Sequence, residues 1–195
     1  MERIPSMPNL PALGYTTEGM AFDSSRSVTV LFEFDNSLGA TRTLEWDGMF
    51  WYEREVGTGP SRRDGYRMVY DPIRALTVLF GGGHLFNYFG DTWVWNGVNW
   101  TQVSNTGPSP RYAHSMAWDP QHAGILLRGG ITGEYEQDTW LWNGTVWSQL
   151  STIGPDVTDA PMIYDEARQE IVLFGGEDFG TISGETWVWN GTLWT

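Results

Sequence analysis

The feature that most constrains this chain is a ten-residue segment that recurs at an almost constant interval. Residues 91–100 read Asp-Thr-Trp-Val-Trp-Asn-Gly-Val-Asn-Trp, and residues 138–147 and 185–194 repeat this segment at a spacing of 47 residues. A more divergent copy lies upstream, at residues 42–51. Repeats of roughly 20 to 50 residues are typical of arrays in which each unit buries its apolar face against a neighbouring unit. The sequence therefore predicts four similar structural units.

The tryptophans follow this repeat. Eleven of the 12 fall into three columns: Trp46, Trp95, Trp142 and Trp189; Trp51, Trp100, Trp147 and Trp194; and Trp93, Trp140 and Trp187. Only Trp118 lies outside them. Aromatic residues that contact a ligand need not recur at a fixed phase, whereas the core residues of stacked repeats must. We therefore expect these eleven side chains to pack inside the protein.

Each unit has the pattern of four short β-strands. The first ends in an aromatic residue and aspartate, and the second is a short apolar run that is expected to be buried on both faces. In three of the units the second strand ends in a glycine pair, which predicts positive φ or close backbone approach. The third strand is the Thr-Trp-x-Trp element, and the Asn-Gly or Asp-Gly that follows predicts a type I′ hairpin turn into the fourth strand. No segment has the pattern of an amphipathic helix.

These motifs resemble the kelch repeat of the galactose-oxidase-like propellers. Aromatic-Asp, an apolar strand ending in Gly-Gly, Asp-Thr-Trp and a spaced tryptophan recur in this order across residues 11–195. The resemblance implies an all-β fold, a β-propeller of four kelch-like, four-stranded antiparallel blades. The first repeat departs from the pattern, with Glu33-Phe34 in place of Gly-Gly and Arg42-Thr43-Leu44 in place of Asp-Thr-Trp. Galactose oxidase itself needs a cysteine-modified tyrosine beside copper, and this chain contains no cysteine.

The repeats also predict the domain organisation. We expect a single domain over residues 1–195, with blades near 12–58, 59–106, 107–153 and 154–195, the last completed by residues 2–6. The segment Glu2-Arg3-Ile4 stands where a fourth strand is expected, which favours a ring of four that closes through the N-terminus and a monomeric protein. The alternative is a fragment of a larger propeller, because kelch-like propellers usually have five to seven blades.

Composition excludes several classes of function. The net charge of −13 argues against a sequence-independent nucleic-acid binder or a protein that binds anionic membranes, since both need a basic surface. The absence of cysteine excludes disulfides, thiolate metal sites and a cysteine nucleophile. No apolar run approaches the roughly 18 residues of a transmembrane helix, and the first residues show no apolar signal region. An extracellular or cell-surface location is implied only by the family resemblance.

The candidate site residues lie where the repeat phase is broken, on the loops after the glycine pairs and on the loops between blades. In a kelch-like blade both loop sets open on one face of the ring. The candidate ligand-binding residues there are Arg63, His84, Phe86, Asn87, Tyr88, Arg111, His114, Glu134, Tyr135, Asp178 and Phe179. Arg63 and Arg111 share a column, which also favours a structural role in binding loop carbonyls. The three histidines fall at different phases, so no metal site or other cofactor is predicted.

Three functions remain open at this point. The first is a non-catalytic domain that binds a carbohydrate or a peptide or protein ligand at the loop face, with the aromatic residues stacking on the ligand. The second is a sugar-acting enzyme such as a kelch-type epimerase or mutarotase, with His84, His114 or Glu134 as the acid or base. The third is a purely structural repeat module. Asp91, Asp138 and Glu185 recur at the entry to a strand, so we interpret them as acceptors for backbone N–H groups rather than as catalytic acids.

Overall fold

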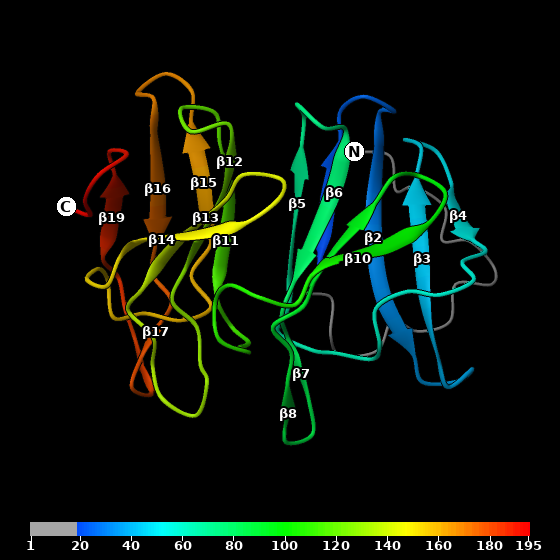
Figure 1. Cartoon of the computed structure of the whole chain (residues 1–195), viewed down its shortest axis with the longest axis horizontal. Helices are drawn as coiled ribbons and strands as arrows, with labels where there is room; N and C mark the ends of the chain where they lie inside the picture. The colour runs from blue at the N-terminus through cyan, green and yellow to red at the C-terminus, as the bar shows by residue number, and fades with distance from the viewer. Residues whose placement is uncertain (1–18) are drawn as a thin grey trace, which may run out of the picture.

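The computed structural model describes residues 19–195, and all regular secondary structure within them is β-strand (Figure 1). Blade 1 contains β1 (Met20–Asp23), β2 (Val28–Asp35), β3 (Ala40–Trp46) and β4 (Trp51–Arg54). Blade 2 contains β5 (Arg67–Asp71), β6 (Leu76–Phe80), β9 (Thr92–Trp95) and β10 (Trp100–Ser104). Blade 3 contains β11 (Ser115–Asp119), β12 (Gly124–Arg128), β13 (Thr139–Trp142) and β14 (Trp147–Ser151). Blade 4 contains β15 (Met162–Asp165), β16 (Glu170–Phe174) and β19 (Thr186–Trp189).

The sheets are antiparallel and arranged as the blades of a four-blade β-propeller, which confirms the predicted fold class. The first strands of consecutive blades lie along one another, β1 on β5, β5 on β11 and β11 on β15. In blade 4, Trp194 forms a bridge with Trp189, and Val188 and Thr195 exchange two backbone hydrogen bonds of 2.9 and 3.0 Å. These pairs occupy the position at which the fourth strand of the other blades begins.

The core consists of three apolar clusters, each between two consecutive blades. The first tryptophan column contributes Trp95, Trp142 and Trp189, which are all at most 2% exposed. Trp93, Trp140 and Trp187 of the third column are partly buried and pack against the same clusters. The prediction that the repeated tryptophans pack inside is therefore confirmed wherever two blades meet. In blade 1, by contrast, Trp46 and Trp51 are half-buried.

Closure of the ring stays a prediction. Within residues 19–195, none of the three apolar clusters joins blade 4 to blade 1, and β15 makes no contact with β1 comparable to those between consecutive inner strands. Figure 1 shows β19 and β4 toward opposite ends of the longest axis of the molecule. The N-terminal strand expected at Glu2-Arg3-Ile4 lies outside the described residues, and the domain boundaries stay a prediction as well.

The structure confirms the prediction for the glycine pairs and contradicts the turn type predicted for the Asx-Gly segments. Gly81 and Gly82 have φ values of 67° and 93°, and a Cβ on Gly82 would lie 2.9 Å from the carbonyl oxygen of Asp64, so positive φ and close approach are both confirmed. The type I′ prediction is wrong, because Gly97 has positive φ but Asn96 does not. The loop spans four residues, 96–99, and the Asn96 Oδ1 atom accepts the N–H groups of Val98 and Asn99 at 2.9 and 2.8 Å. An asparagine side chain that caps such a loop does not itself need positive φ.

Blade 1 replaces the glycine pair with a longer hairpin. Strands β2 and β3 stay paired as far as Asp35 and Ala40, and a buried Arg42 bonds Asp35 at 2.6 Å. Glu33 lies 3.5 Å from the same guanidinium. Blade 1 therefore lacks the loop that follows the glycine pair in the other three blades, and the candidate site is built by blades 2, 3 and 4.

Candidate functional site

The two loop sets meet at one end of the blades, as the sequence predicted. Backbone bridges join Asp64 to Gly83, Tyr112 to Ile131 and Thr158 to Glu177, so each loop between blades pairs with a loop that follows a glycine pair. Two of the latter form small hairpins, β7 (Gly83–His84) with β8 (Asn87–Tyr88) and β17 (Glu177–Asp178) with β18 (Thr181–Ile182). Both hairpins project from the same end of the molecule (Figure 1).

A cavity of about 350 Å³ lies among these loops. The residues that line it are Asp64, Gly65, Gly83, Leu85, Tyr88, Tyr112, Ala113 and Asp159, and they come from the loops of blades 2 and 3 and from the loop that leads into blade 4. This volume lies toward the lower end of the range of about 300 to 1,000 Å³ that is usual for small-molecule sites. The loops therefore enclose enough space for a small ligand or for one end of a larger one.

A stacked tyrosine pair forms one side of this cavity. The ring centroids of Tyr88 and Tyr112 are 5.1 Å apart with an angle of 30° between the ring planes. Burial raises the pKa of Tyr112, and the nearby Tyr88, Tyr135, Asp159 and Glu177 raise it further. The Tyr112 hydroxyl is therefore protonated at neutral pH and available as a hydrogen-bond donor.

Two carboxylates, Asp64 and Asp159, line the same cavity. Asp159 is exposed and forms a 2.7 Å ion pair with Arg67, which joins the loop before blade 4 to the first strand of blade 2. Because ionised carboxylates only accept hydrogen bonds, this part of the cavity suits a ligand rich in donors such as hydroxyl or amine groups.

The remaining predicted loop residues form a second group. Tyr135 packs against Phe179 with a centroid distance of 4.3 Å, which links the loop of blade 3 to the β17–β18 hairpin. Phe86 is 97% exposed at the tip of the β7–β8 hairpin. His84 is half-buried, whereas Asn87, Glu134 and Asp178 are exposed on the same loops. The structure thus brings Tyr88 to the cavity and leaves the other members of this group outside its lining.

Arg63 and Arg111 lie beneath the loops rather than on their surface. Each is at most 3% exposed, and each donates to the carbonyl oxygen of the first glycine of its blade's pair, Gly81 at 3.0 Å and Gly129 at 2.8 Å. The structural role expected for this column is confirmed. A ligand at the loop surface does not reach these two guanidinium groups in the described conformation.

The recurring acids of the Asp-Thr-Trp element are acceptors, but their donors differ from those expected. Asp91 binds Arg63 at 2.6 Å and the indole N–H of Trp93 at 2.7 Å. Asp138 has the same two kinds of partner, an arginine at 2.9 Å and an indole at 2.6 Å. Side-chain donors thus supply the hydrogen bonds that we had assigned to backbone N–H groups. Burial raises the pKa of Asp91, but the hydrogen bond and charge of Arg63 outweigh it, so the net pKa is lowered.

His114 is fully buried between blades 2 and 3. Its ring packs edge-on against Phe80 at 5.4 Å, and burial, together with the positive charges of Arg67 and Arg111, holds its pKa well below the ordinary value. Within residues 19–195, both ring nitrogens of His114 are buried without a hydrogen-bond partner, whereas His84 is half-buried and Glu134 is exposed on the loops. The sugar-acting enzyme therefore stays a hypothesis that rests on the sequence.

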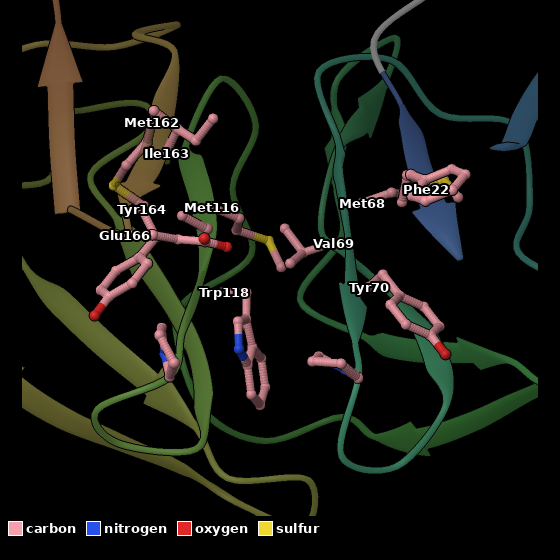
Figure 2. Close-up of a pocket in the computed structure, with 14 residues that line it drawn as sticks. Phe22, Met68, Val69, Tyr70, Met116, Trp118, Met162, Ile163, Tyr164 and Glu166 are labelled. Atoms are coloured by element: carbon pink, nitrogen blue, oxygen red, sulfur yellow. The ribbon is translucent and has the colours of Figure 1, made fainter. Parts of the chain in front are cut away.

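A second, larger cavity of about 770 Å³ was missed by the sequence analysis. It lies between the first strands of the four blades, and Figure 2 shows methionine and aromatic side chains around it. Its aromatic residues are those that precede the aspartate at the end of each first strand, namely Phe22, Tyr70, Trp118 and Tyr164. The signal was present as the aromatic-Asp motif that ends each first strand, but candidate site residues were taken only from loops where the repeat phase is broken. The cavity is the space around the propeller axis.

No group of His, Asp or Glu residues in the described part of the chain could hold a metal ion. Among the same residues, no helix is long and apolar enough to cross a membrane.

In comparisons with known proteins, no protein-family model and no curated protein matches the chain. The propeller arrangement therefore rests on the coordinates, and the kelch relationship remains a resemblance carried by the motifs.

Proposed function

We propose that this propeller is a carbohydrate-binding domain whose ligand occupies the cavity beside Tyr88 and Tyr112. The observation that carries the proposal is the combination, in one loop-enclosed cavity, of a stacked tyrosine pair with two carboxylates. Loops held by a rigid β-scaffold are the usual position for such a site. The kelch resemblance supports the assignment to a binding domain, because its motifs specify the scaffold and leave these loops free to vary.

The chemistry of the lining favours a sugar. The C–H groups on one face of a sugar ring carry partial positive charge and pack well on the negative face of an aromatic ring. Sugar hydroxyls donate to carboxylates, and Asp64 and Asp159 supply such acceptors within the same cavity. A neutral or amino sugar is expected to bind better than an acidic one, since the two carboxylates and the net charge of −13 repel an anion.

The experiment is a glycan array followed by titration calorimetry of the best neutral ligand. We expect Tyr88→Ala to weaken binding by at least about tenfold, because truncating a central aromatic residue of a binding site commonly costs more than roughly 1.4 kcal/mol. Asp64→Asn should weaken binding as well, while keeping the shape of the side chain.

The matched control is Phe86→Ala. Phe86 is the most exposed aromatic residue on the same hairpin and does not line the cavity, so its truncation should leave sugar affinity unchanged. If no glycan binds, or if Phe86→Ala lowers the affinity as much as Tyr88→Ala does, the proposed site is incorrect. An array of extended peptides run in parallel would then decide whether the loop face binds a peptide instead.

A further inference from the structure

The three contacts between consecutive blades are built in the same way. In each, the indole N–H of a second-column tryptophan donates to a threonine hydroxyl of the preceding blade. The pairs are Trp100 with Thr43, Trp147 with Thr92 and Trp194 with Thr139, at 2.8, 2.9 and 3.0 Å. All three threonines are fully buried. Each blade therefore carries a tryptophan for the blade before it and a threonine for the blade after it.

A second contact also recurs between consecutive blades. The turn after the first strand of each blade reaches the Asx-Gly turn of the next blade. Arg26 lies against Gly97, Arg74 donates to the carbonyl oxygen of Asn143, and His122 lies against Gly191. Like the first contact, this one joins each blade to the blade that follows it. Each blade therefore has the first-strand turn for the blade after it and the Asx-Gly turn for the blade before it.

Among residues 19–195, nothing fills the half of each contact that blade 1 provides. Trp51 is only half-buried, and no atom lies within 4 Å of a Cβ built on Gly48. Met20 and Phe22 are 55% and 58% exposed, although their counterparts in blade 2, Met68 and Tyr70, are 6% and 8% exposed. We call Met20, Phe22, Gly48 and Trp51 the blade-1 face.

In the same part of the chain, nothing fills the complementary half of each contact, which blade 4 provides. Thr186 is exposed, whereas its three counterparts are buried, and 70% of the Arg168 side chain is exposed. Phe174 is 54% exposed, although Phe32 and Phe80 at the same position of β2 and β6 are at most 2% exposed. Ile163, Arg168, Phe174 and Thr186 form the blade-4 face.

We propose that two copies of this chain associate head to tail, with the blade-4 face of each copy on the blade-1 face of the other, in a closed ring of eight blades. Each face already matches its partner, because the same contacts hold blades 1 to 4 together within the chain. Figure 1 shows the outer strands β4 and β19 toward opposite ends of the longest axis, and none of the three apolar clusters of the described residues joins the two faces within one chain. A ring of eight blades lies within the range of roughly four to eight blades that is typical of propellers.

Charge supports a second copy as the occupant. The turn on blade 1 begins with Asp47, whereas the equivalent turns of the other blades begin with asparagine at positions 96, 143 and 190. By the repeated contact, the residue that reaches the Asp47 turn is Arg168 of the other copy. The only acidic residue among these four turn positions would therefore face Arg168 of the other copy. Trp51 of one copy would donate to Thr186 of the other, as the second-column tryptophans do within the chain.

The test is sedimentation velocity of the 195-residue chain over a range of concentrations. We expect a dimer, and we expect Phe22→Asp or Phe174→Asp alone to raise the dissociation constant by at least about tenfold. An equimolar mixture of these two variants should associate again, because one of the two contacts in the mixed ring then joins two unaltered faces. The control is Phe86→Asp, which makes the same change at an exposed site away from both faces and should leave the dimer intact.

A wild-type chain that stays monomeric at all concentrations overturns the proposal. So does a mixture that stays monomeric, or a loss of association on Phe22→Asp with no effect of Phe174→Asp, which would indicate that two blade-1 faces meet each other. If either aspartate variant fails to fold, the exposed charge pair gives the same information. Asp47→Arg and Arg168→Asp should each weaken the dimer, and the chain that carries both changes should recover it.

Discussion

Phe80 and Phe174 occupy the same position in the second strand of blades 2 and 4, but only Phe80 is covered by a following blade. Phe80 is fully buried and packs on Trp147 of blade 3 with a centroid distance of 5.1 Å, whereas Phe174 is 54% exposed. Replacing each of them with alanine removes the same side chain from the same strand position, once where a following blade covers it and once where none does. The difference measures how much the contact between blades contributes to stability.

The expected costs differ severalfold. Truncation of a buried phenylalanine typically costs about 3 to 5 kcal/mol, because the apolar surface is lost and a cavity is left. Phe174→Ala should cost at most about 1 kcal/mol, since more than half of that side chain is already in water. The difference of about 3 kcal/mol corresponds to a melting temperature that is roughly 6 to 12 °C lower for Phe80→Ala than for Phe174→Ala.

Urea unfolding followed by circular dichroism measures both free energies. The experiment is run at a concentration at which the chain sediments as a single monomeric species, because association would cover Phe174. The dependence on urea should be the same in both variants, which confirms that the same surface unfolds. Equal costs for the two substitutions would refute the conclusion that blade 4 has an uncovered face in the single chain.

Two further predictions concern the loop end of the blades. Because the folded state lowers the pKa of His114, it favours the neutral imidazole; stability should be constant above the unfolded pKa of about 6.5 and fall below it by up to roughly 1.4 kcal/mol per pH unit. His114→Leu should flatten this decline between pH 7.5 and 5.5 in urea unfolding, and an unchanged slope would contradict the assignment. Gly82→Ala should destabilise the protein by more than about 1 kcal/mol, because the new Cβ meets the Asp64 carbonyl oxygen as well as the strain of positive φ. Gly133 also has positive φ, but no atom lies within 4 Å of a Cβ added there. Gly133→Ala therefore measures the backbone strain alone and should lower the melting temperature less than Gly82→Ala does.

Much of the fold was predictable because a repeat must satisfy the same packing condition in every copy. Trp95, Trp142 and Trp189 recur in phase and are all buried, and the glycine pairs have the predicted backbone conformation. Arg63 and Arg111 were assigned a structural role on the same grounds, and both bind loop carbonyls.

The candidate site was predictable only as a region. Loops that break the repeat were expected on one face, and the backbone bridges place them there. Tyr112, Asp64 and Asp159 were not selected from those loops, although they line the cavity with Tyr88. Which side chains share one cavity depends on how loops from different blades lie across one another, and a sequence pattern within a single blade contains no information on this.

The sequence by itself determined the blade, because strand length, alternation and the turn residues are local properties that each 47-residue unit specifies alone. Only the tertiary structure decided which faces are covered. The same phenylalanine position is buried in β6 and exposed in β16, and the same tryptophan column is buried at Trp100 and half-buried at Trp51. The physical reason is that burial between blades depends on the presence and angle of a neighbouring blade, so identical local patterns at the middle and at the ends of the array have different surroundings.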